Sequence, residues 1–234
     1  MQEIQLQQIL RTFGVPQLRE GQDRLIELAL AGVNALGVMP TGHGKSLCYQ
    51  AAAMLAGGTS IVVSPLIALM RDQVQSLQRR GIAAARFDST LAEDERHSLL
   101  ADVAAGRLSL LFVAPESLES PALCQALASA DLQIFVVDEA HCVSEWGHSF
   151  RPDYLKLPAW CRARGFRCVM ALTATATQRV QADLCRAFSI DPRHVVQHSP
   201  YRANISRLVV APESPTEYLL NFLQQARNRP AIVY

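Results

Sequence analysis

Lysine is nearly absent from this chain of 234 residues. Only Lys45 and Lys156 occur among its 22 basic residues, so the other 20 are arginine. No excess of either charge is present, because the formal net charge is +1. Composition therefore neither indicates nor excludes a nucleic-acid partner, and a DNA-binding surface would need its basic residues gathered on one face. A lysine in an informative position stands out from this background.

Paired cysteines and long apolar runs are also missing. The six cysteines are scattered without a CxxC pair, which excludes a typical zinc motif and a disulfide framework. Free thiols in a reducing compartment are expected. No apolar run approaches the ~20 residues of a membrane helix, and the first ten residues do not read as a signal peptide. The sequence predicts an intracellular, cytoplasmic protein with no membrane partner.

One of the two lysines lies in the segment Met39-Pro40-Thr41-Gly42-His43-Gly44-Lys45-Ser46. An apolar run, Ala35 to Val38, precedes it, and helix-forming residues follow it. A strand, a glycine-rich turn and a helix present backbone N–H groups at the helix N-terminus, which suits a polyphosphate. Lys45 would reach the outer phosphates and the Ser46 hydroxyl would hold magnesium. The alternative is a turn that only joins a strand to a helix.

Apolar strands alternate with helical segments along most of the chain. This pattern predicts an α/β fold with a parallel sheet covered by helices on both faces. The expected strands are 35–38, 60–64, 83–87, 108–113, 132–137 and 168–172, with short strands also possible at 195–196 and 208–210. The expected helices are 3–12, 17–31, 47–55, 66–80, 91–105, 154–164, 177–188 and 218–227.

Polar motifs follow the carboxyl ends of these strands, where parallel sheets bind ligands along one edge. Besides the glycine-rich segment, they are Ser64-Pro65, Pro115-Glu116, Asp138-Glu139 and Thr173-Ala174-Thr175. In the adjacent carboxylates Asp138 and Glu139, one would face a magnesium shell and the other would polarise a water for attack on the γ-phosphate. The alternative is a charged strand end exposed to solvent.

Together these motifs resemble the first motor domain of the RecQ family of superfamily 2 DNA helicases. The resemblance covers nearly the whole chain, and its most specific part is VDEAHCVSEWGHSFRPDY, residues 137–154. It implies a RecA-like fold. The segments that carry it are Val38 to Gln50, Ser64 to Gln73, Val113 to Glu116, Val137 to Tyr154 and Ala171 to Thr175.

The resemblance implies ATP and Mg²⁺ as cofactors. Asp138, with Ser46, would hold the metal, Glu139 would be the hydrolytic base, and His141, Thr173 and Thr175 would relay the nucleotide state. Arg19 and Gln22 match the adenine-reading segment, although this chain has Val15 and Leu18 where aromatic residues are usual. A solvated helix face is the alternative for this pair. The nucleotide-binding residues expected are Arg19, Gln22, Thr41, Gly42, His43, Gly44, Lys45, Ser46 and Leu47.

The resemblance also implies contacts with DNA. Ser64 and Pro65 lie in a segment that would meet phosphates of one strand. Trp146, Phe150 and Arg151 belong to the loop that senses single-stranded DNA in this family, where aromatic faces stack on bases of any sequence. A buried core position for Trp146 is the alternative.

The expected function is an ATP-dependent DNA helicase acting 3′ to 5′ on single-stranded DNA and on duplexes with a single-stranded tail. A translocase that does not separate strands and a nucleotide-gated DNA-binding module stay open. Residues 1–211 are expected to form the first RecA-like domain. Residues 212–234 would be a linker, a helix and the first strand, at Ile232-Val233-Tyr234, of a second RecA-like domain, with accessory domains beyond it. DNA as a substrate suggests the bacterial nucleoid or, alternatively, the nucleus.

Overall fold

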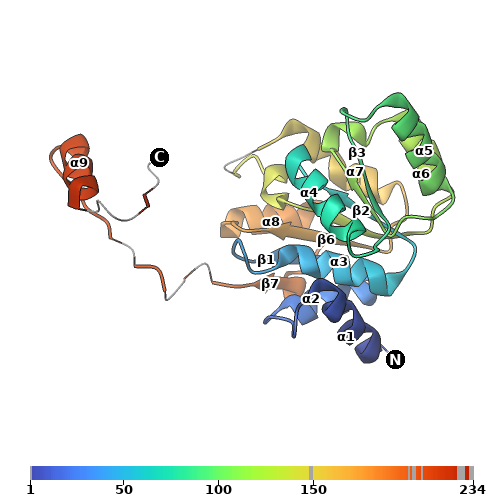
Figure 1. The fold of residues 1–234 in the computed structure, drawn as a ribbon, viewed down its shortest axis with the longest axis horizontal. Coiled ribbons are helices and arrows are strands. Elements are labelled where there is room, and N and C mark those ends of the chain that lie inside the picture. Colours follow the sequence, from blue (N-terminus) through green and yellow to red (C-terminus); the bar gives the residue numbers. More distant parts are fainter. Residues whose placement is uncertain are drawn as a thin grey trace. The chain divides into compact units, whose positions relative to one another are not determined.

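A computed structural model describes residues 2–147, 150–199, 201, 204–206, 208–225 and 230–231. By internal contacts the chain divides into two units, Met1–Pro200 and Tyr201–Tyr234. The first unit carries all the polar motifs named above (Figure 1).

The described part of the first unit contains one seven-stranded sheet, in which every paired neighbour is parallel. The strand order is β3-β4-β2-β5-β6-β1-β7. The expected parallel α/β fold is therefore confirmed. The strands are β1 (Ala35–Val38), β2 (Thr59–Val63), β3 (Ala84–Phe87), β4 (Leu110–Val113), β5 (Leu132–Val137), β6 (Cys168–Thr173) and β7 (Val195–Gln197).

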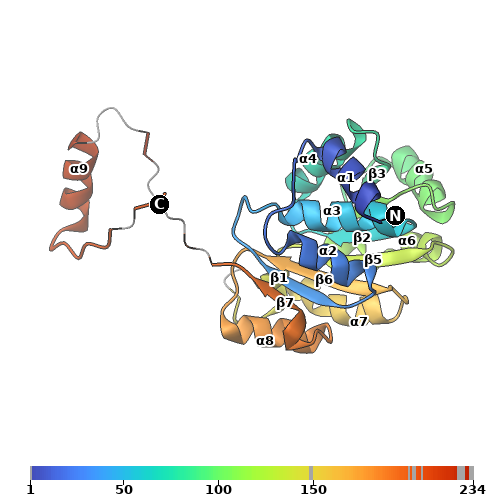
Figure 2. The ribbon, with the colours of Figure 1, turned by 90° about the horizontal axis from the view of Figure 1, so that it is seen from below.

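Helices cover both faces of this sheet (Figure 2). The period-two alternation of strand side chains divides the core, because Ile61 and Val63 of β2 face one layer and Val62 the other. Helices α1 to α4 cover the face of Val62, and α5 to α8 cover the opposite face. Their bounds are α1 (Gln2–Phe13), α2 (Gln22–Leu30), α3 (Lys45–Ala56), α4 (Ile67–Gln78), α5 (Glu93–Ala104), α6 (Pro121–Leu127), α7 (Leu157–Arg162) and α8 (Gln178–Ala187).

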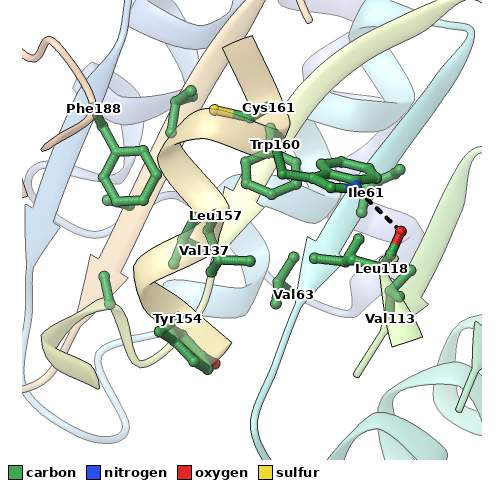
Figure 3. Close-up of a cluster of buried hydrophobic side chains, with 14 of the residues drawn as sticks. Ile61, Val63, Val113, Leu118, Val137, Tyr154, Leu157, Trp160, Cys161 and Phe188 are labelled. Atoms are coloured by element: carbon green, nitrogen blue, oxygen red, sulfur yellow. Dashed lines mark hydrogen bonds between the residues drawn. The ribbon is translucent and has the colours of Figure 1, made fainter. Parts of the chain in front are cut away.

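The core layer of Ile61 also anchors the segment that follows β5. Trp160 of α7 packs at 5.5 Å, centroid to centroid, against Phe135 of β5, and its indole N–H donates to the Leu118 carbonyl at 3.0 Å (Figure 3). Tyr154, fully buried in the 3₁₀ turn η3 (Pro152–Lys156), lies in the same layer. A buried aromatic or large aliphatic side chain contributes about 1.5–3 kcal/mol, so this cluster fixes the residues around it.

The expected helix over 17–31 is wrong at its start. α2 begins at Gln22, and the preceding Gly21 has a φ of 79°, which interrupts a helix. Arg19 therefore lies in a turn before the helix and does not share a helix face with Gln22. The Gln22 side chain accepts the Arg19 backbone N–H at 2.7 Å, which closes that turn.

The second unit contains helix α9 (Pro215–Gln225), and none of its described side chains is buried. Leu208 to Val210 form no strand and are exposed, Val209 at 97%, so the expected strand at 208–210 is wrong. The strand expected at Ile232-Val233-Tyr234 lies outside the described residues, as does the end of the helix expected to reach Arg227. Among the helices described, none combines the length and apolar character needed to cross a membrane.

Candidate functional site

The polar motifs meet at one edge of the sheet because every strand that carries one runs in the same direction. Strands β5, β6 and β1 are consecutive neighbours. Val38 at the end of β1 pairs in register with Thr173 at the end of β6. Val137, the last residue of β5, pairs with Ala171 of β6. The glycine-rich loop, Thr173 and the Asp138-Glu139 pair therefore follow three adjacent strand ends.

The glycine-rich loop reverses direction through two left-handed glycines. Gly42 has a φ of 79° and Gly44 a φ of 87°, conformations that are strained for a residue with a side chain. Gly44 is the N-cap of α3 and has no side-chain cap. The first N–H groups of α3, at Lys45 and Ser46, thus form an uncapped positive helix end, which suits an anion.

Lys45 lies folded against its own loop. Its Nζ donates to the Met39 carbonyl at 3.0 Å, and Met39 in turn donates its N–H to the Thr173 carbonyl at 3.0 Å. Met39 stands where a phosphate loop usually has glycine, and its side chain is fully buried. The residue therefore anchors the loop to β6 and gives Lys45 a resting position beside the helix end.

Gln22 is buried, at 2% exposure, against the same loop. Its Nε2 donates to the carbonyls of His43 and Gly44 at 2.9 and 3.1 Å, and the Arg19 guanidinium donates to the Gly42 carbonyl. Both amide hydrogens of Gln22 are therefore used within the chain. Arg19 and Gln22 hold the loop, and Gln22 could read adenine bidentately only by releasing one of these carbonyls.

His198 is a neighbour of the loop that the sequence did not indicate. Its ring stacks on that of His43 with centroids 4.7 Å apart, and its backbone N–H donates to the Val38 carbonyl at 2.9 Å. The ring of His43 also lies within hydrogen-bond distance, 3.2 Å, of the Glu20 carbonyl. An isolated histidine after a short strand gives no sequence signal of this contact.

Asp138 is a partly buried carboxylate beside a second one. Burial and, after it, the Glu139 carboxylate raise the pKa of Asp138 to about 6, against the lowering effects of the Glu139 N–H and the Lys45 ammonium. Negative charge at this strand end is therefore under-compensated by the chain itself. Magnesium fits these residues, because a cation held by Ser46 and, through water, by Asp138 would supply the missing positive charge.

Glu139 connects this carboxylate pair to β6. It adopts a left-handed conformation with φ 48°, uncommon for a residue other than glycine. Its Oε2 lies 3.4 Å from His141 Nδ1, which lies 2.9 Å from Thr173 Oγ1. Thr173 Oγ1 donates to the Thr175 carbonyl at 3.0 Å and accepts the Thr175 N–H at 3.2 Å. The carboxylate, the imidazole and the two threonines thus form one connected network.

Tyr154 contacts the same strand end from the core. Sequence alone assigned this residue no role beyond its place in the 137–154 motif. Its hydroxyl donates to the Asp138 carbonyl at 3.1 Å. Desolvation, more than any nearby charge, raises the pKa of the Tyr154 hydroxyl, so it stays a donor. The backbone between the two carboxylates is therefore fixed from the core.

The segment after Glu139 presents an exposed tryptophan. Trp146 is 59% exposed, so its alternative placement in the core is wrong. Phe150 is 37% exposed, and Arg151 donates from Nη1 to the Pro65 carbonyl at 3.3 Å. A Cβ on Gly147 would lie 2.2 Å from the His141 carbonyl, so the tight turn beside Trp146 requires glycine. Residues 148 and 149 of this loop lie outside the described residues.

Ser64 lies below the surface, at 2% exposure. Its Oγ has no hydrogen-bond partner among the residues that the structure describes. The contact of this hydroxyl with a DNA phosphate stays a prediction. Pro65 is partly exposed, and Leu66 beside it is 49% exposed.

Comparison with known proteins assigns this site a family. Residues 19–184 match the family model described as DEAD/DEAH box helicase. The chain is 39% identical over 224 residues to the ATP-dependent DNA helicase RecQ of Bacillus subtilis, which covers 95% of this chain and 38% of that protein. It is 41% identical over 235 residues to the probable ATP-dependent DNA helicase RecS of the same organism, covering 98% and 47%. The chain thus spans less than half the length of either relative.

Solved structures agree on the fold. The Hef helicase domain of Pyrococcus furiosus matches with a TM-score of 0.61 at 20% identity, over 80% of this chain and 39% of that one. The DUF1998 helicase MrfA, solved bound to DNA, matches with a TM-score of 0.66 at 20% identity, over 83% and 27%. At this identity the likeness concerns the fold alone, and it identifies the sheet as RecA-like.

Proposed function

We propose, from the premise that this chain belongs to the DEAD/DEAH box helicase family, that it forms the ATP-binding motor domain of a RecQ-type DNA helicase. The predicted resemblance to RecQ helicases is confirmed by the two Bacillus relatives. Activity, substrate and partners of the whole protein belong to the proposal, because the chain spans 38% and 47% of those relatives.

The observation that carries the proposal is the set of three charged side chains on adjacent strand ends. Lys45 follows β1, and Asp138 and Glu139 follow β5, with β6 between them. The Lys45 ammonium is close enough to Asp138 to lower its pKa. Such an arrangement supports the proposal, because it would bring a phosphate-binding cation and a hydrolytic carboxylate to one phosphate chain.

Each side chain has a role in hydrolysis. Lys45 leaves the Met39 carbonyl and binds the outer phosphates. The uncapped N–H groups at the start of α3 donate hydrogen bonds to oxygens of the same phosphate chain. Ser46 and Asp138 would hold Mg²⁺, which supplies charge neutralisation on the phosphate oxygens. Glu139 accepts a proton from the attacking water, and His141, hydrogen-bonded to Thr173, keeps the carboxylate in place.

The nucleic-acid side of the proposal uses the Trp146 segment. Single-stranded DNA would stack on Trp146 and Phe150, and Arg151 links this segment to the Pro65 turn, the other expected DNA contact. We propose 3′-to-5′ movement on single strands and on tailed duplexes, with a second RecA-like domain that supplies an arginine to the γ-phosphate. That domain and the accessory domains would lie in the part of the protein that matches the rest of the relatives.

ATP turnover measured with and without single-stranded DNA tests this function. DNA-stimulated hydrolysis together with separation of a tailed duplex by the whole protein is expected. Stimulation without strand separation would favour the translocase, and DNA binding without any hydrolysis would favour the nucleotide-gated binding module.

Replacing Trp146 by alanine in the whole protein is expected to uncouple DNA from hydrolysis. Loss of one base–aromatic stack should cost about 1–3 kcal/mol of single-strand binding. DNA stimulation should be largely lost, while hydrolysis without DNA is kept, because Lys45, Asp138 and Glu139 are unchanged. ATPase assays with and without a single-stranded oligonucleotide measure both effects.

Thermal melting supplies the control for that variant. Because Trp146 is 59% exposed, its removal should leave the melting temperature within about a degree of the original protein. A well-folded variant with undiminished stimulation would contradict the role of this loop in DNA sensing.

Replacing Gln22 by alanine tests which of two roles this glutamine has. It removes the hydrogen bonds to His43 and Gly44 that hold the loop. If holding the loop is its main role, binding of Mg-ATP and of Mg-GTP should both weaken, by roughly tenfold for one to two hydrogen bonds. Calorimetry with both nucleotides is the measurement, and loss of ATP binding alone would assign Gln22 to adenine recognition.

A further inference from the structure

Residues 144–146, which follow the Asp138-Glu139 pair in the chain, are held against one face of α8. Arg179 and Asp183 of α8 are four residues apart and therefore lie on the same side of the helix. The Arg179 guanidinium carbon lies 3.3 Å from the centroid of the Trp146 ring. The Ser144 hydroxyl donates to Asp183 Oδ2 at 2.8 Å. The tryptophan segment thus has two attachments to α8.

Ser144 makes the second attachment specific. It is 3% exposed, and its Oγ also accepts the Trp146 backbone N–H at 3.3 Å. The hydroxyl therefore uses its hydrogen toward α8 and a lone pair toward Trp146. Asp183 is therefore linked to the backbone of Trp146 through the Ser144 hydroxyl, and Arg179 lies over its ring.

The Trp146 ring remains available while Arg179 covers one of its faces. With the guanidinium in contact, the residue is still 59% exposed. An aromatic ring has two faces, so the face away from Arg179 can stack on a base. The Arg179 contact therefore presents the ring to solvent in a fixed orientation and does not hide it.

α8 is also connected to the hydrolytic network. Its N-cap, Thr177, accepts the Val180 N–H at 3.3 Å and follows Thr175 by two residues. Thr175 is hydrogen-bonded to Thr173, which contacts His141. The tryptophan segment follows Glu139 of this network, and α8 follows Thr175 of the same network. The two segments contact each other at Arg179 and Asp183.

We propose that Arg179 and Asp183 are positioning residues that hold Trp146 ready for a nucleobase of single-stranded DNA. This proposal rests on the proposed function and adds to it two residues of α8 outside the motifs of the resemblance. A ring that is already correctly oriented needs less ordering when it binds a base. When fewer Trp146 rings are correctly oriented, the apparent affinity for DNA is therefore lower. The base stacks on the open face of Trp146 while Arg179 stays on the other face.

Acrylamide quenching of tryptophan fluorescence tests the positioning without DNA. The chain has two tryptophans, and Trp160 is 8% exposed, so quenching reports mainly on Trp146. Arg179→Ala should raise the quenching constant toward that of an unrestrained tryptophan, and Arg179→Lys should restore part of the difference. Arg107→Ala, an exposed arginine that pairs with Asp102 and is not part of α8, is the matched control and should match the original chain.

Binding of a single-stranded oligothymidylate, measured by fluorescence anisotropy at several salt concentrations, tests the consequence. Arg179→Ala should weaken binding by ~2–5-fold, the range expected when an exposed cation–π contact is lost. Asp183→Ala, which leaves the Ser144 hydroxyl without this acceptor, should also weaken binding. The slope of log affinity against log salt should not change, because neither side chain contacts a phosphate in this proposal.

Two results would overturn the proposal. Unchanged quenching in Arg179→Ala would show that this arginine does not hold the ring. A salt slope lowered by about one would show instead that Arg179 binds a backbone phosphate. If the whole protein binds no single-stranded DNA, the proposed function fails, and the quenching of the variants still decides whether Arg179 positions Trp146.

Discussion

Replacing Lys45 by alanine is expected to abolish nucleotide-dependent behaviour and to leave the fold intact. Lys45 lies beside the uncapped end of α3, so its charge is placed for a bound phosphate. A charge-assisted hydrogen bond contributes about 1.5–3 kcal/mol, so Mg-ATP should bind roughly 10- to 200-fold more weakly. Turnover should fall further, because charge develops on the phosphoryl oxygens during transfer. Calorimetry with Mg-ATP and an ATPase assay measure the two effects.

Lys156 provides the control for this experiment, since it is the other lysine of the chain. It is exposed and follows the 137–154 motif by two residues, but its ammonium pairs with Glu119 at 2.8 Å and lies 4.0 Å from Asp153, so its charge is paired outside the phosphate loop. Lys156→Ala should therefore bind and hydrolyse ATP normally. Lys45→Ala loses one hydrogen bond, to the Met39 carbonyl. Its free energy of unfolding should therefore lie within about 1 kcal/mol of that of the original protein. Normal Mg-ATP affinity in Lys45→Ala would refute the assignment of the phosphate loop.

Replacing Glu139 by glutamine is expected to stop hydrolysis while nucleotide still binds. Glutamine keeps the size of the side chain but cannot accept the proton of the attacking water. General-base catalysis contributes about 10²–10⁴-fold to a rate, and the loss should fall in that range. Measurement of the rate of phosphate release at saturating Mg-ATP, beside calorimetry of binding, separates the two steps.

The neighbouring carboxylate gives this variant a second expected effect. The Glu139 charge contributes to the raised pKa of Asp138, so its removal should lower that pKa and favour ionised Asp138. Binding of Mg-ATP should accordingly be kept. Glu119→Gln, an exposed carboxylate outside the site, is the matched control and should hydrolyse ATP at the original rate. Retained turnover in Glu139→Gln would mean that another group is the base.

The sheet could be predicted from sequence because its strands are uninterrupted apolar runs. β5 begins and ends at the predicted residues, β6 extends one residue further, and β2 begins and ends one residue earlier than predicted. Such runs are buried on both faces, so composition alone marks them. The predicted bounds fail where a side-chain hydrogen bond or the lack of a neighbouring strand determines the local structure. α2 starts late because Gly21 and the side-chain bond of Gln22 make a turn, and the apolar run 208–210 has no neighbouring strand to pair with.

The residues of the candidate site also fall into two groups, those that the sequence could indicate and those that only the fold brings to the site. Its proposed catalytic residues could be selected from sequence because the phosphate loop and the paired carboxylates have specific residue types at fixed spacing. His198 and Arg179 could not, since each acts through a contact with a residue distant in sequence. An arginine on an amphipathic helix usually lies in solvent, and only the fold brings this one over Trp146.

The strand order also sets a distance between the two ends of the ligand-binding edge. From β1, which carries the phosphate loop, to β4, which precedes Pro115, the sheet advances four strands through β6, β5 and β2. At about 4.8 Å for each step, the separation is roughly 19 Å. A phosphate bound at the loop after β1 and a DNA phosphate at the end of β4 would therefore be separated by the ends of β6, β5 and β2. In the proposed motor, coupling between nucleotide and DNA would run through the segments after β5 and β2. Arg151 donates to the Pro65 carbonyl and Tyr154 donates to the Asp138 carbonyl, so residues 151–154 connect those two strand ends.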